Sequence, residues 1–496
     1  MAELSTRSTY VLKPRARPVR WGRIFLFAIL LLLALAAAHV LTGFYQDQQL
    51  KNQIEWLRRQ GEPMLAEDFT ARQVAVADED NAALALYWAA QSMDVWSEAA
   101  DKLWWVYFEL PFSDEEMGVL SAGLEANREP LQRLREAREK RGVNWQVEFN
   151  RPLMFFEVGR FEGHADLAGL ARADVLVMHQ MGRESEALER ARDLLMMVRV
   201  LSEAGINKSA DSAKNRMISA ADVIQQIAVD LRIGQSMSEA KPAEVRKLIE
   251  ELLDEKRPAQ MQRLAVRWQR AEAVDLLRCA AEGIPFPDEK KSREDWYFAM
   301  GAKPWLLWDA RLLLEHWNEA VKLSDESGDA ASFQIAAQEG TAAQRQIEEH
   351  PKRHLMADFS IKWWRESVLW HWEVAAERRM AALALAIRWY AVEHGGQLPL
   401  GLEQLVPEYL PAMPSDPFAG GGRKFGYVAN CEGPIIYSVG SNGKDDGGSD
   451  QVLRMTLYAG RWDREDAVVP LKRPYREHFP VTSPYRVING VEMRVR

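Results

Sequence analysis

The chain has 496 residues, of which 47% are hydrophobic and 27% are charged, a composition typical of globular proteins and unlike that of disordered or fibrous ones. One hydrophobic core seldom organises so long a chain, so we expect two or more folded units. The formal net charge is −9, and no concentrated basic surface follows residue 25. The sequence therefore predicts no nucleic-acid partner, because neutralising phosphates needs such a surface.

An uncharged apolar run near the N-terminus predicts a membrane anchor. Residues 24–41 read IFLFAILLLLALAAAHVL, about the shortest stretch with which an α-helix crosses the hydrocarbon core of a bilayer. Trp21 on one side and Phe44 and Tyr45 on the other are suited to the two membrane interfaces. We predict a single transmembrane anchor over residues 24–45, with the membrane as its partner.

The charge of the N-terminal flank predicts the orientation of this anchor. Residues 1–23 hold a single acid, Glu3, against these basic side chains: Arg7, Lys13, Arg15, Arg17, Arg20 and Arg23. Since basic flanks stay in the cytoplasm, we expect a cytoplasmic tail over residues 1–23 and an extracytoplasmic bulk, at an inner membrane of bacterial type. The alternative is a signal peptide cleaved before His39. The long basic leader and the continuation of the run to Leu41 favour the anchor, and both interpretations export the rest of the chain.

Residues 46–375 show helical periodicity almost throughout, and the sequence predicts a mainly α fold. Ser113 and Glu116 are expected to form a capping box that opens a helix reaching about Lys140. Residues 164–204 resemble one tetratricopeptide-like helical hairpin, but no second copy follows at a fixed period. Further helices are expected at about 210–233, 242–282, 304–324, 330–349 and 357–394.

Toward the C-terminus, Gly and Pro become frequent and short β-prone runs replace long helices. We place a small α+β module at residues 376–460, with strands at 425–428 and 434–439. A C-terminal extension, residues 461–496, follows this module. Its last part, Tyr475 to Arg496, is expected to add strands or a loosely packed tail.

The sequence predicts no catalytic residue. His350 and His354 have the spacing of a helical metal pair, but a proline separates them and no Glu follows His350, which favours two solvated histidines at a helix boundary. His371 lies on a Trp-rich helix, where packing and surface salt bridges account for it. No nucleophile elbow, phosphate-binding loop or dinucleotide fingerprint is present. Cys279 and Cys431 match no metal-ligand spacing, and a disulfide between them stays open.

The stretch SVGSNGKDDGGSD, residues 438–450, is the most informative polar segment. Asn442, Asp445, Asp446 and Asp450 place several oxygen atoms in a glycine-rich loop, as a hard cation such as calcium requires. The loop does not fit the EF-hand template. From the residues alone, a calcium loop and a solvated acidic turn are both open.

Between residue 380 and the acidic loop, a series of residues matches a known domain in identity and order. They are Met380, Leu383, Ala384, Ile387, Ala391, Gly395, Gly396, Gln397, Leu398, Pro399, Leu402, Leu405, Val406, Pro407, Tyr409, Leu410, Pro414, Asp416, Pro417, Phe418, Tyr427, Tyr437, Ser438, Val439, Gly440, Asn442, Gly443, Lys444, Asp445, Asp446, Gly447 and Gly448. Together they resemble the globular domain of the major pseudopilin of type II secretion systems. The resemblance covers under a fifth of the chain.

This resemblance implies that the loop binds calcium through Asn442, Asp445 and Asp446, with Asp450 as a further ligand and a main-chain carbonyl near Val439. The chain departs from the family at its N-terminus, where the prepilin-peptidase site and the early Glu of an assembling pilus subunit are missing. We therefore expect no pilus-type polymerisation and a module that serves binding or stability.

These observations favour a membrane-anchored extracytoplasmic interaction or scaffold protein, with protein partners and a module stabilised by calcium. Two alternatives stay open. One is an exported hydrolase with a site assembled from distant parts of the helical body. The other is an accessory component of a secretion or pilus-like apparatus, by analogy with the module alone. A deep pocket lined by histidine and carboxylates favours the enzyme, and a surface poor in pockets favours the scaffold.

Overall fold

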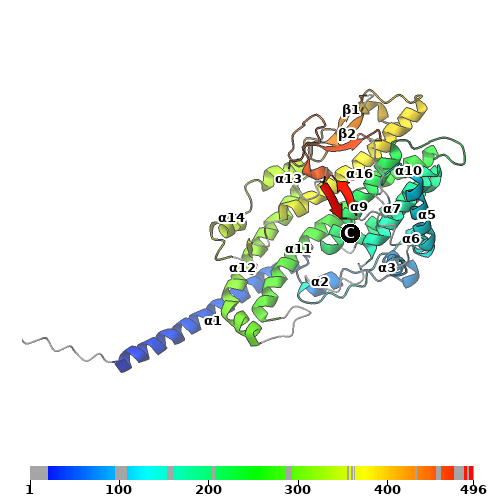
Figure 1. The fold of residues 1–496 in the computed structure, drawn as a ribbon. Coiled ribbons are helices and arrows are strands. Elements are labelled where there is room, and N and C mark those ends of the chain that lie inside the picture. The colour runs from blue at the N-terminus through cyan, green and yellow to red at the C-terminus, as the bar shows by residue number, and fades with distance from the viewer. Residues whose placement is uncertain are drawn as a thin grey trace, which may run out of the picture.

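Most of the described chain is helical, and a small antiparallel sheet lies near its C-terminal end (Figure 1). The prediction of a mainly α fold is confirmed. The computed structural model describes residues 21–94, 109–153, 161, 163–203, 207–284, 293–354, 357–358, 361, 364–430, 433–453, 460–473, 485–488 and 491–494, with the backbone alone at 207–216, 293–299 and from 485 on.

The helices and strands occur in the following order. They are α1 (Trp21–Arg59), α2 (Ala66–Thr70), η1 (Asp78–Asp80), α3 (Ala82–Gln91), α5 (Asp114–Ala126), α6 (Arg128–Glu139), α7 (His164–Gln180), α8 (Glu184–Ser202), α9 (Asn207–Ala228), α10 (Pro242–Leu253), α11 (Lys256–Glu282), α12 (Arg293–Glu326), α13 (Ala330–Ala337), α14 (Ala342–Glu349), α16 (Trp364–Glu393), η4 (Leu402–Leu405), β1 (Gly426–Val428), β2 (Ile435–Ser438), η5 (Arg461–Asp463), β3 (Ala467–Pro470), β4 (Tyr485–Ile488) and β5 (Val491–Arg494).

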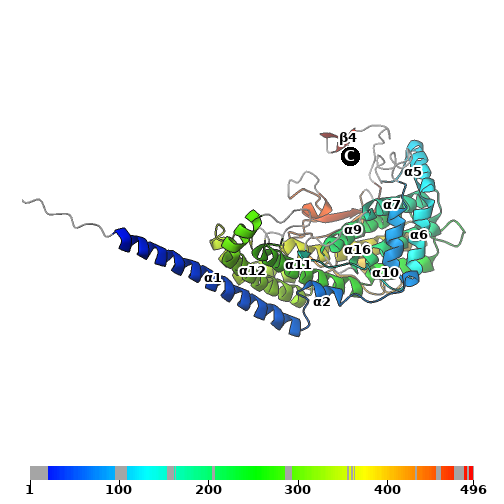
Figure 2. The ribbon, with the colours of Figure 1, turned by 90° about the horizontal axis from the view of Figure 1, so that it is seen from below.

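Helix α1 runs without a break from the apolar run into the helical body (Figure 2). The side chains of its first part are exposed, and among the described helices it alone is long and apolar enough to cross a membrane. Farther along, Leu50, Ile54 and Leu57 are buried and recur at the spacing of one helical face. The border between the predicted anchor and the predicted body therefore falls inside one helix.

Helices α1, α11 and α12 pack together around what we call the α1–α12 core. Gly43 of α1 is buried against Pro304 of α12, and Arg311 donates a hydrogen bond to Gln46 Oε1 at 2.8 Å. This core also takes side chains of α13, α14 and the first turns of α16. Its members include Leu50, Ile54, Leu57, Val266, Val274, Leu277, Leu307, Leu313, Leu314, Trp317, Phe333, Ile347, Trp364 and Val368.

The second, larger core lies among α3, α5 to α10 and α16. The predicted hairpin is confirmed as α7 and α8, joined by a turn in which Gly182 has φ +76°. The predicted capping box is also confirmed: the Ser113 N–H donates to Glu116 Oε2 at 2.8 Å, and the Glu116 N–H donates to Ser113 Oγ at 3.2 Å.

Three predicted helices are each interrupted. The helix expected to reach Lys140 breaks between α5 and α6, because Pro130 lacks the N–H for the next helical hydrogen bond and its ring clashes with the carbonyl four residues earlier. The helix expected at 242–282 is split into α10 and α11, whose first turn contains Pro258. The helix expected at 330–349 is split into α13 and α14, with Gly340 at φ +70° between them.

The predicted strands at 425–428 and 434–439 are confirmed as β1 and β2, which form an antiparallel sheet in the order β1-β2-β3. Gly426 lies opposite Tyr437, and a Cβ at this glycine would come within 2.0 Å of the tyrosine ring. Strand β3 comes from the segment predicted as the C-terminal extension. The β4–β5 hairpin lies in the last part of that extension, where strands were one of two expectations.

The sheet shares the larger core with the helical body. Helix α16 continues through the predicted border between body and module, and its Met380 packs in the same core as Ile436 of β2. Glu377 of α16 is buried and accepts hydrogen bonds from Gln225 Nε2 at 3.0 Å and Arg461 Nη1 at 2.7 Å. Contacts between distant parts of the chain thus hold the C-terminal region on the helices.

We expect Leu50→Ala to lower the free energy of unfolding of the full chain in detergent by roughly 2–5 kcal/mol, because it leaves a hole in a core that α1 completes. Chemical denaturation followed by circular dichroism measures this loss. Leu33→Ala, on the exposed part of the same helix, is the matched control and should change it little. Equal stability of the Leu50→Ala variant and the unmodified chain would contradict the packing of α1 in the body.

Candidate functional site

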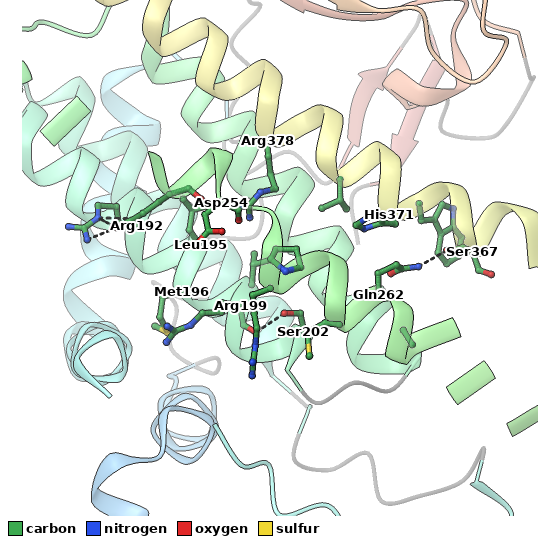
Figure 3. A pocket seen from close by; sticks show the side chains of 18 of the residues that line it. Arg192, Leu195, Met196, Arg199, Ser202, Asp254, Gln262, Ser367, His371 and Arg378 are labelled. Carbon is green, nitrogen blue, oxygen red and sulfur yellow. Dashed lines mark hydrogen bonds and ion pairs between the residues drawn. The ribbon is translucent and has the colours of Figure 1, made fainter. Parts of the chain in front are cut away.

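A cavity of about 410 Å³ lies among α8, α11 and α16, with α6 and the end of α10 beside it (Figure 3). We call it the α8–α16 cavity. Cavities of this size are typical of sites for small molecules. Its lining residues extend along the chain from Arg138 to Arg378, and the sequence predicted none of them as a site residue.

Arg378 fixes the geometry of one end of the cavity. It reaches from α16 toward Asp254, where α10 ends (Figure 3). Its buried guanidinium donates hydrogen bonds to the main-chain carbonyl oxygens of Glu251, Leu252 and Asp254 at 2.7, 2.9 and 2.8 Å. These carbonyls are left without helical partners at the end of α10, and a cation is favoured there. Arg378 thus joins α16 to α10.

Arg192 joins α8 to α10 at the same end. Its guanidinium donates to both carboxylate oxygens of Glu251, with Nη2 to Oε1 at 2.7 Å, and to Glu189 at 2.7 Å. The hydrogen bonds to Glu251 raise the pKa of Arg192 above its usual range. Arg138 of α6 pairs with Glu189 at 2.6 Å. Because the pairs Arg192–Glu251 and Arg138–Glu189 cross between helices, they hold the wall in place.

The wall between these polar groups is apolar. Buried and half-buried side chains of the three main helices face the cavity. A ligand with an apolar part can pack against them and so remove apolar surface from water. They are Leu195, Met196 and Val198 of α8, Met261 and Ala265 of α11, and Trp370 and Val374 of α16.

Positive charge predominates around the cavity. Its lining contains five arginines against two acids, Glu251 and Asp254. At the exposed rim, Arg257 pairs with Glu203 at 2.9 Å. Arg199, also exposed, has no ion pair with a described residue. The cavity therefore combines an apolar interior with a cation that is available to an anionic group.

His371 of α16 lines the same cavity and is half-buried. Burial lowers the pKa of its imidazole to about 4, and the nearby positive charges of Arg379, Arg263 and Arg378 act in the same direction. The imidazole has a ring contact with Trp372, at 4.9 Å between centroids, and no hydrogen bond to a described residue. It is therefore neutral at physiological pH, and of the two explanations that the sequence offered, packing and surface salt bridges, its surroundings agree with packing.

The two hydroxyl groups of the cavity are engaged by the protein. Ser367 Oγ donates to Gln269 Oε1 at 3.0 Å or to the Trp364 carbonyl at 2.8 Å, and Ser202 Oγ donates to the Arg199 carbonyl at 2.7 Å. A serine nucleophile needs a hydrogen bond to a base instead. The arrangement therefore suits binding better than acyl transfer.

A second cavity of about 380 Å³ surrounds His179 at the end of α7. His179 Nδ1 lies 2.6 Å from Glu184 Oε2, and Nε2 lies 2.9 Å from Asp230 Oδ1. Burial acts to lower the pKa of His179, but the hydrogen bonds to Asp230 and Glu184 outweigh it and raise the pKa. Arg473 pairs with Asp230 as well. Since both ring nitrogens are occupied, this cluster links the C-terminal region to α7 and leaves no free nitrogen for a general base.

In the acidic loop at 438–450, each of the four predicted calcium ligands has a hydrogen-bond or ion-pair partner, and Asn442 and Asp446 are partners of each other. Asp445 Oδ1 accepts from the Tyr437 hydroxyl at 2.9 Å, and the exposed Asp450 lies 3.5 Å from Arg464. Asn442 Nδ2 donates to Asp446 Oδ2 at 2.8 Å. No group of three or more His, Cys, Asp or Glu side chains suited to a metal ion occurs among the residues that the structure describes. Calcium binding by the loop stays a prediction, and it would require these side chains to come together around the ion.

The residue that organises the loop is Asp466, which the sequence analysis did not identify. Its carboxylate is buried beneath the loop and accepts the main-chain N–H groups of Gly448 at 2.7 Å and Ser449 at 3.1 Å. Burial raises the pKa of Asp466 in spite of these donors. Asp466 lies directly before β3, so only the pairing of β3 with β2 brings it to the loop.

The histidines His350 and His354 and the two cysteines were also considered in the sequence analysis. His354 is buried, with Nδ1 2.6 Å from Asp309 Oδ1, so the prediction of two solvated histidines is wrong for His354; His350 is exposed at the end of α14. Cys279 is buried beside Asp275, and Cys431 lies outside the described residues, so the open disulfide stays open.

Comparison with known proteins returned no match: no protein-family model, curated protein or solved structure is similar to this chain. The pseudopilin resemblance of residues 376–460 therefore stays a prediction.

The pKa of His371 predicts a pH dependence of stability. Because its pKa in the folded protein lies below that of an unfolded histidine, about 6.5, the unfolded chain binds more protons between these values. The free energy of unfolding should fall as pH decreases from 6.5 to 4, with His371 contributing up to about 1.4 kcal/mol per pH unit. Denaturant titrations of His371→Gln across this range should show a shallower decrease. An unchanged slope would contradict a neutral, buried His371.

The calcium prediction has a direct test in thermal unfolding of the full chain with calcium and with a chelator. Binding to the folded state should raise the melting midpoint, since a ligand at a hundred times its Kd adds about 2.7 kcal/mol. The double variant Asp445→Asn with Asp446→Asn should lose the shift. Identical midpoints of the unmodified chain under both conditions would end the calcium hypothesis.

Proposed function

We propose that this protein is a membrane-anchored extracytoplasmic binding protein whose α8–α16 cavity takes an anionic, partly apolar small molecule. The proposal rests on one observation: the same cavity has an apolar wall and is lined by more arginines than acids. An apolar wall removes the body of a ligand from water, while guanidinium groups form charge-assisted hydrogen bonds with an acid group.

The place of the acid group follows from the distribution of charge. Four of the five lining arginines already have partners: Arg138, Arg192 and Arg257 have carboxylates, and Arg378 has main-chain carbonyls. Arg199 at the rim keeps its full donor capacity among the described residues, and Arg378, one of the positive charges that lower the pKa of His371, lines the same cavity. An anion between the rim and His371 is therefore favoured, with its apolar part against α11 and α16.

The anchoring part of the proposal rests on α1 and the residues before it. The exposed apolar part of α1 has the length and composition of a membrane span. The basic side chains before it favour a cytoplasmic N-terminus, which puts the helical body outside the cytoplasm.

The two cavities bear differently on the three functions that the sequence left open: a scaffold, a hydrolase and a secretion component. The presence of a cavity favours a ligand-binding role over a scaffold without a ligand, while protein partners stay part of the proposal. A hydrolase is less favoured, because the hydroxyls of the α8–α16 cavity and both nitrogens of His179 have protein partners. A role in a secretion apparatus rests on the resemblance of the C-terminal module.

Calorimetry on the full chain in nanodiscs tests the cavity, with empty nanodiscs as the blank. Decanoate should bind more tightly than decyltrimethylammonium, an amphiphile of similar chain length and opposite charge. Arg199→Glu should weaken decanoate binding by about tenfold, or about 1.4 kcal/mol. Arg59→Glu, an exposed arginine at the end of α1, is the matched control and should leave binding unchanged.

A second variant tests the location. Ala265 is buried in the cavity wall, so Ala265→Trp should fill the cavity and abolish binding of decanoate while the circular dichroism spectrum is retained. Equal binding of the two probes, or decanoate affinity that survives both Arg199→Glu and Ala265→Trp, would refute the proposed function.

A further inference from the structure

Helix α12 lies beside α1 at the level where the apolar run of α1 ends. His39 Nε2 lies 3.1 Å from the carbonyl oxygen of Met300, and the rings of His39 and Trp305 are 5.4 Å apart between centroids. Farther along both helices, Gln46 of α1 accepts a hydrogen bond from Arg311. The two helices therefore run in the same direction, and the part of α1 from His39 to Gln46 lies beside the part of α12 from Met300 to Arg311.

The exposed surfaces of both helices change character at this level. The exposed residues of α12 from position 300 to 308 are Met300, Gly301, Trp305 and Trp308, none of which is charged. The exposed residues of α12 beyond Arg311 are all charged: Glu315, Glu319, Lys322 and Glu326. On α1 the exposed residues from Ile24 to Tyr45 carry no charge, and charged side chains such as Lys51 and Glu55 follow.

The exposed side chains are large as well as uncharged. Met300 and Trp305 are each 54% exposed and Trp308 is 37% exposed, although the same helix buries Leu306 and Leu307 in the α1–α12 core. We call Met300, Gly301, Trp305 and Trp308 the α12 strip. Exposed apolar groups gathered on one helix face mark a contact surface, and singly scattered ones do not.

We infer that the α12 strip rests in the outer interface of the bilayer that α1 crosses, so that the protein touches the membrane at two places. The apolar run of α1 is about as long as the hydrocarbon core is thick, which puts its end, and the strip beside it, at the outer boundary. Tryptophan is enriched at this boundary because its ring is amphipathic. The inference rests on the membrane anchoring in the proposed function.

The half-buried Lys303 is compatible with this position. Its aliphatic stem packs near Gly43, with Cγ 3.8 Å from where a Cβ of that glycine would lie. A lysine at a membrane boundary buries its stem in this way and extends its ammonium group to the headgroups. Continuity with the apolar surface of α1 therefore favours lipid, rather than a protein partner, as the occupant of the strip.

The depth of a nitroxide label on the full chain in nanodiscs tests the inference. Labels at Met300→Cys, Leu33→Cys and Met237→Cys report the strip, the apolar part of α1 and a side chain that is 99% exposed on the body. Cys431→Ser is the background, and the buried Cys279 should take up no label. The ratio of oxygen to nickel-complex collisions should be highest at position 33, intermediate at 300 and lowest at 237.

The outcomes separate this inference from the proposed function. A low ratio at position 33 would refute membrane anchoring, and the inference with it. A high ratio at 33 together with equal low ratios at 300 and 237 would refute the membrane contact of α12 alone. Spin–spin broadening at position 300 would assign the strip to a second copy of the chain and would also overturn the inference.

A matched pair of variants strengthens the test. Trp305→Glu places a charge within the strip and should lower the ratio at position 300 toward that at 237, because a charged side chain leaves the interface. Trp56→Glu changes an exposed tryptophan in the charged part of α1 and should leave the ratio at 300 unchanged. The same decrease with both variants would contradict a specific contact of the strip.

Discussion

The packing of α1 against α12 is the constraint on which the rest of the structure depends. One continuous helix is apolar on all sides in its first part and apolar on one face in its last part. The last part completes a core to which α11 and α12 contribute most of the remaining side chains. A helix that is shared in this way cannot serve as a loose tether, because separating it from the body would expose Leu50 and Ile54 to water.

Elsewhere in the molecule, polar contacts also join segments that are distant in the sequence. Arg378 satisfies the end of α10 from α16, and Glu377, one residue earlier, holds Arg461 of the C-terminal region. Helix α16 therefore has the α8–α16 cavity beside it and supports the sheet as well. The cavity keeps its shape because its walls are fixed by ion pairs between helices, and the apolar residues between them leave space that no side chain fills.

Local signals in the sequence were sufficient for much of the fold. The apolar run, the Ser113 capping box and the α7–α8 hairpin each depend on residues within a few turns of one another, and all are found in the structure. The breaks near Pro130 and Gly340 were also encoded locally, but the apolar periodicity on both sides of each break favoured one helix. Periodicity reports a shared buried face, and two successive helices can share such a face.

The candidate site was beyond the reach of such signals. His371 and Glu377 resemble surface residues in the sequence. Only the packing of α8, α9 and α11 on α16 places His371 at a cavity and buries Glu377. Likewise, Asp466 follows the acidic loop by more than a dozen residues and reaches it through strand pairing. Conversely, the sequence analysis identified Asn442, Asp445, Asp446 and Asp450 because they are close in sequence. In the structure only Asn442 and Asp446 contact each other, while Asp445 accepts from Tyr437 and Asp450 lies near Arg464.

The most direct test of the central claim is the distance between α1 and the body in a bilayer. Nitroxide labels at Leu33→Cys and at Glu319→Cys on the exposed face of α12 would be measured by double electron–electron resonance in nanodiscs. A rigid continuous helix predicts one narrow distance distribution. A broad distribution, as a flexible joint between anchor and body would give, would contradict the account.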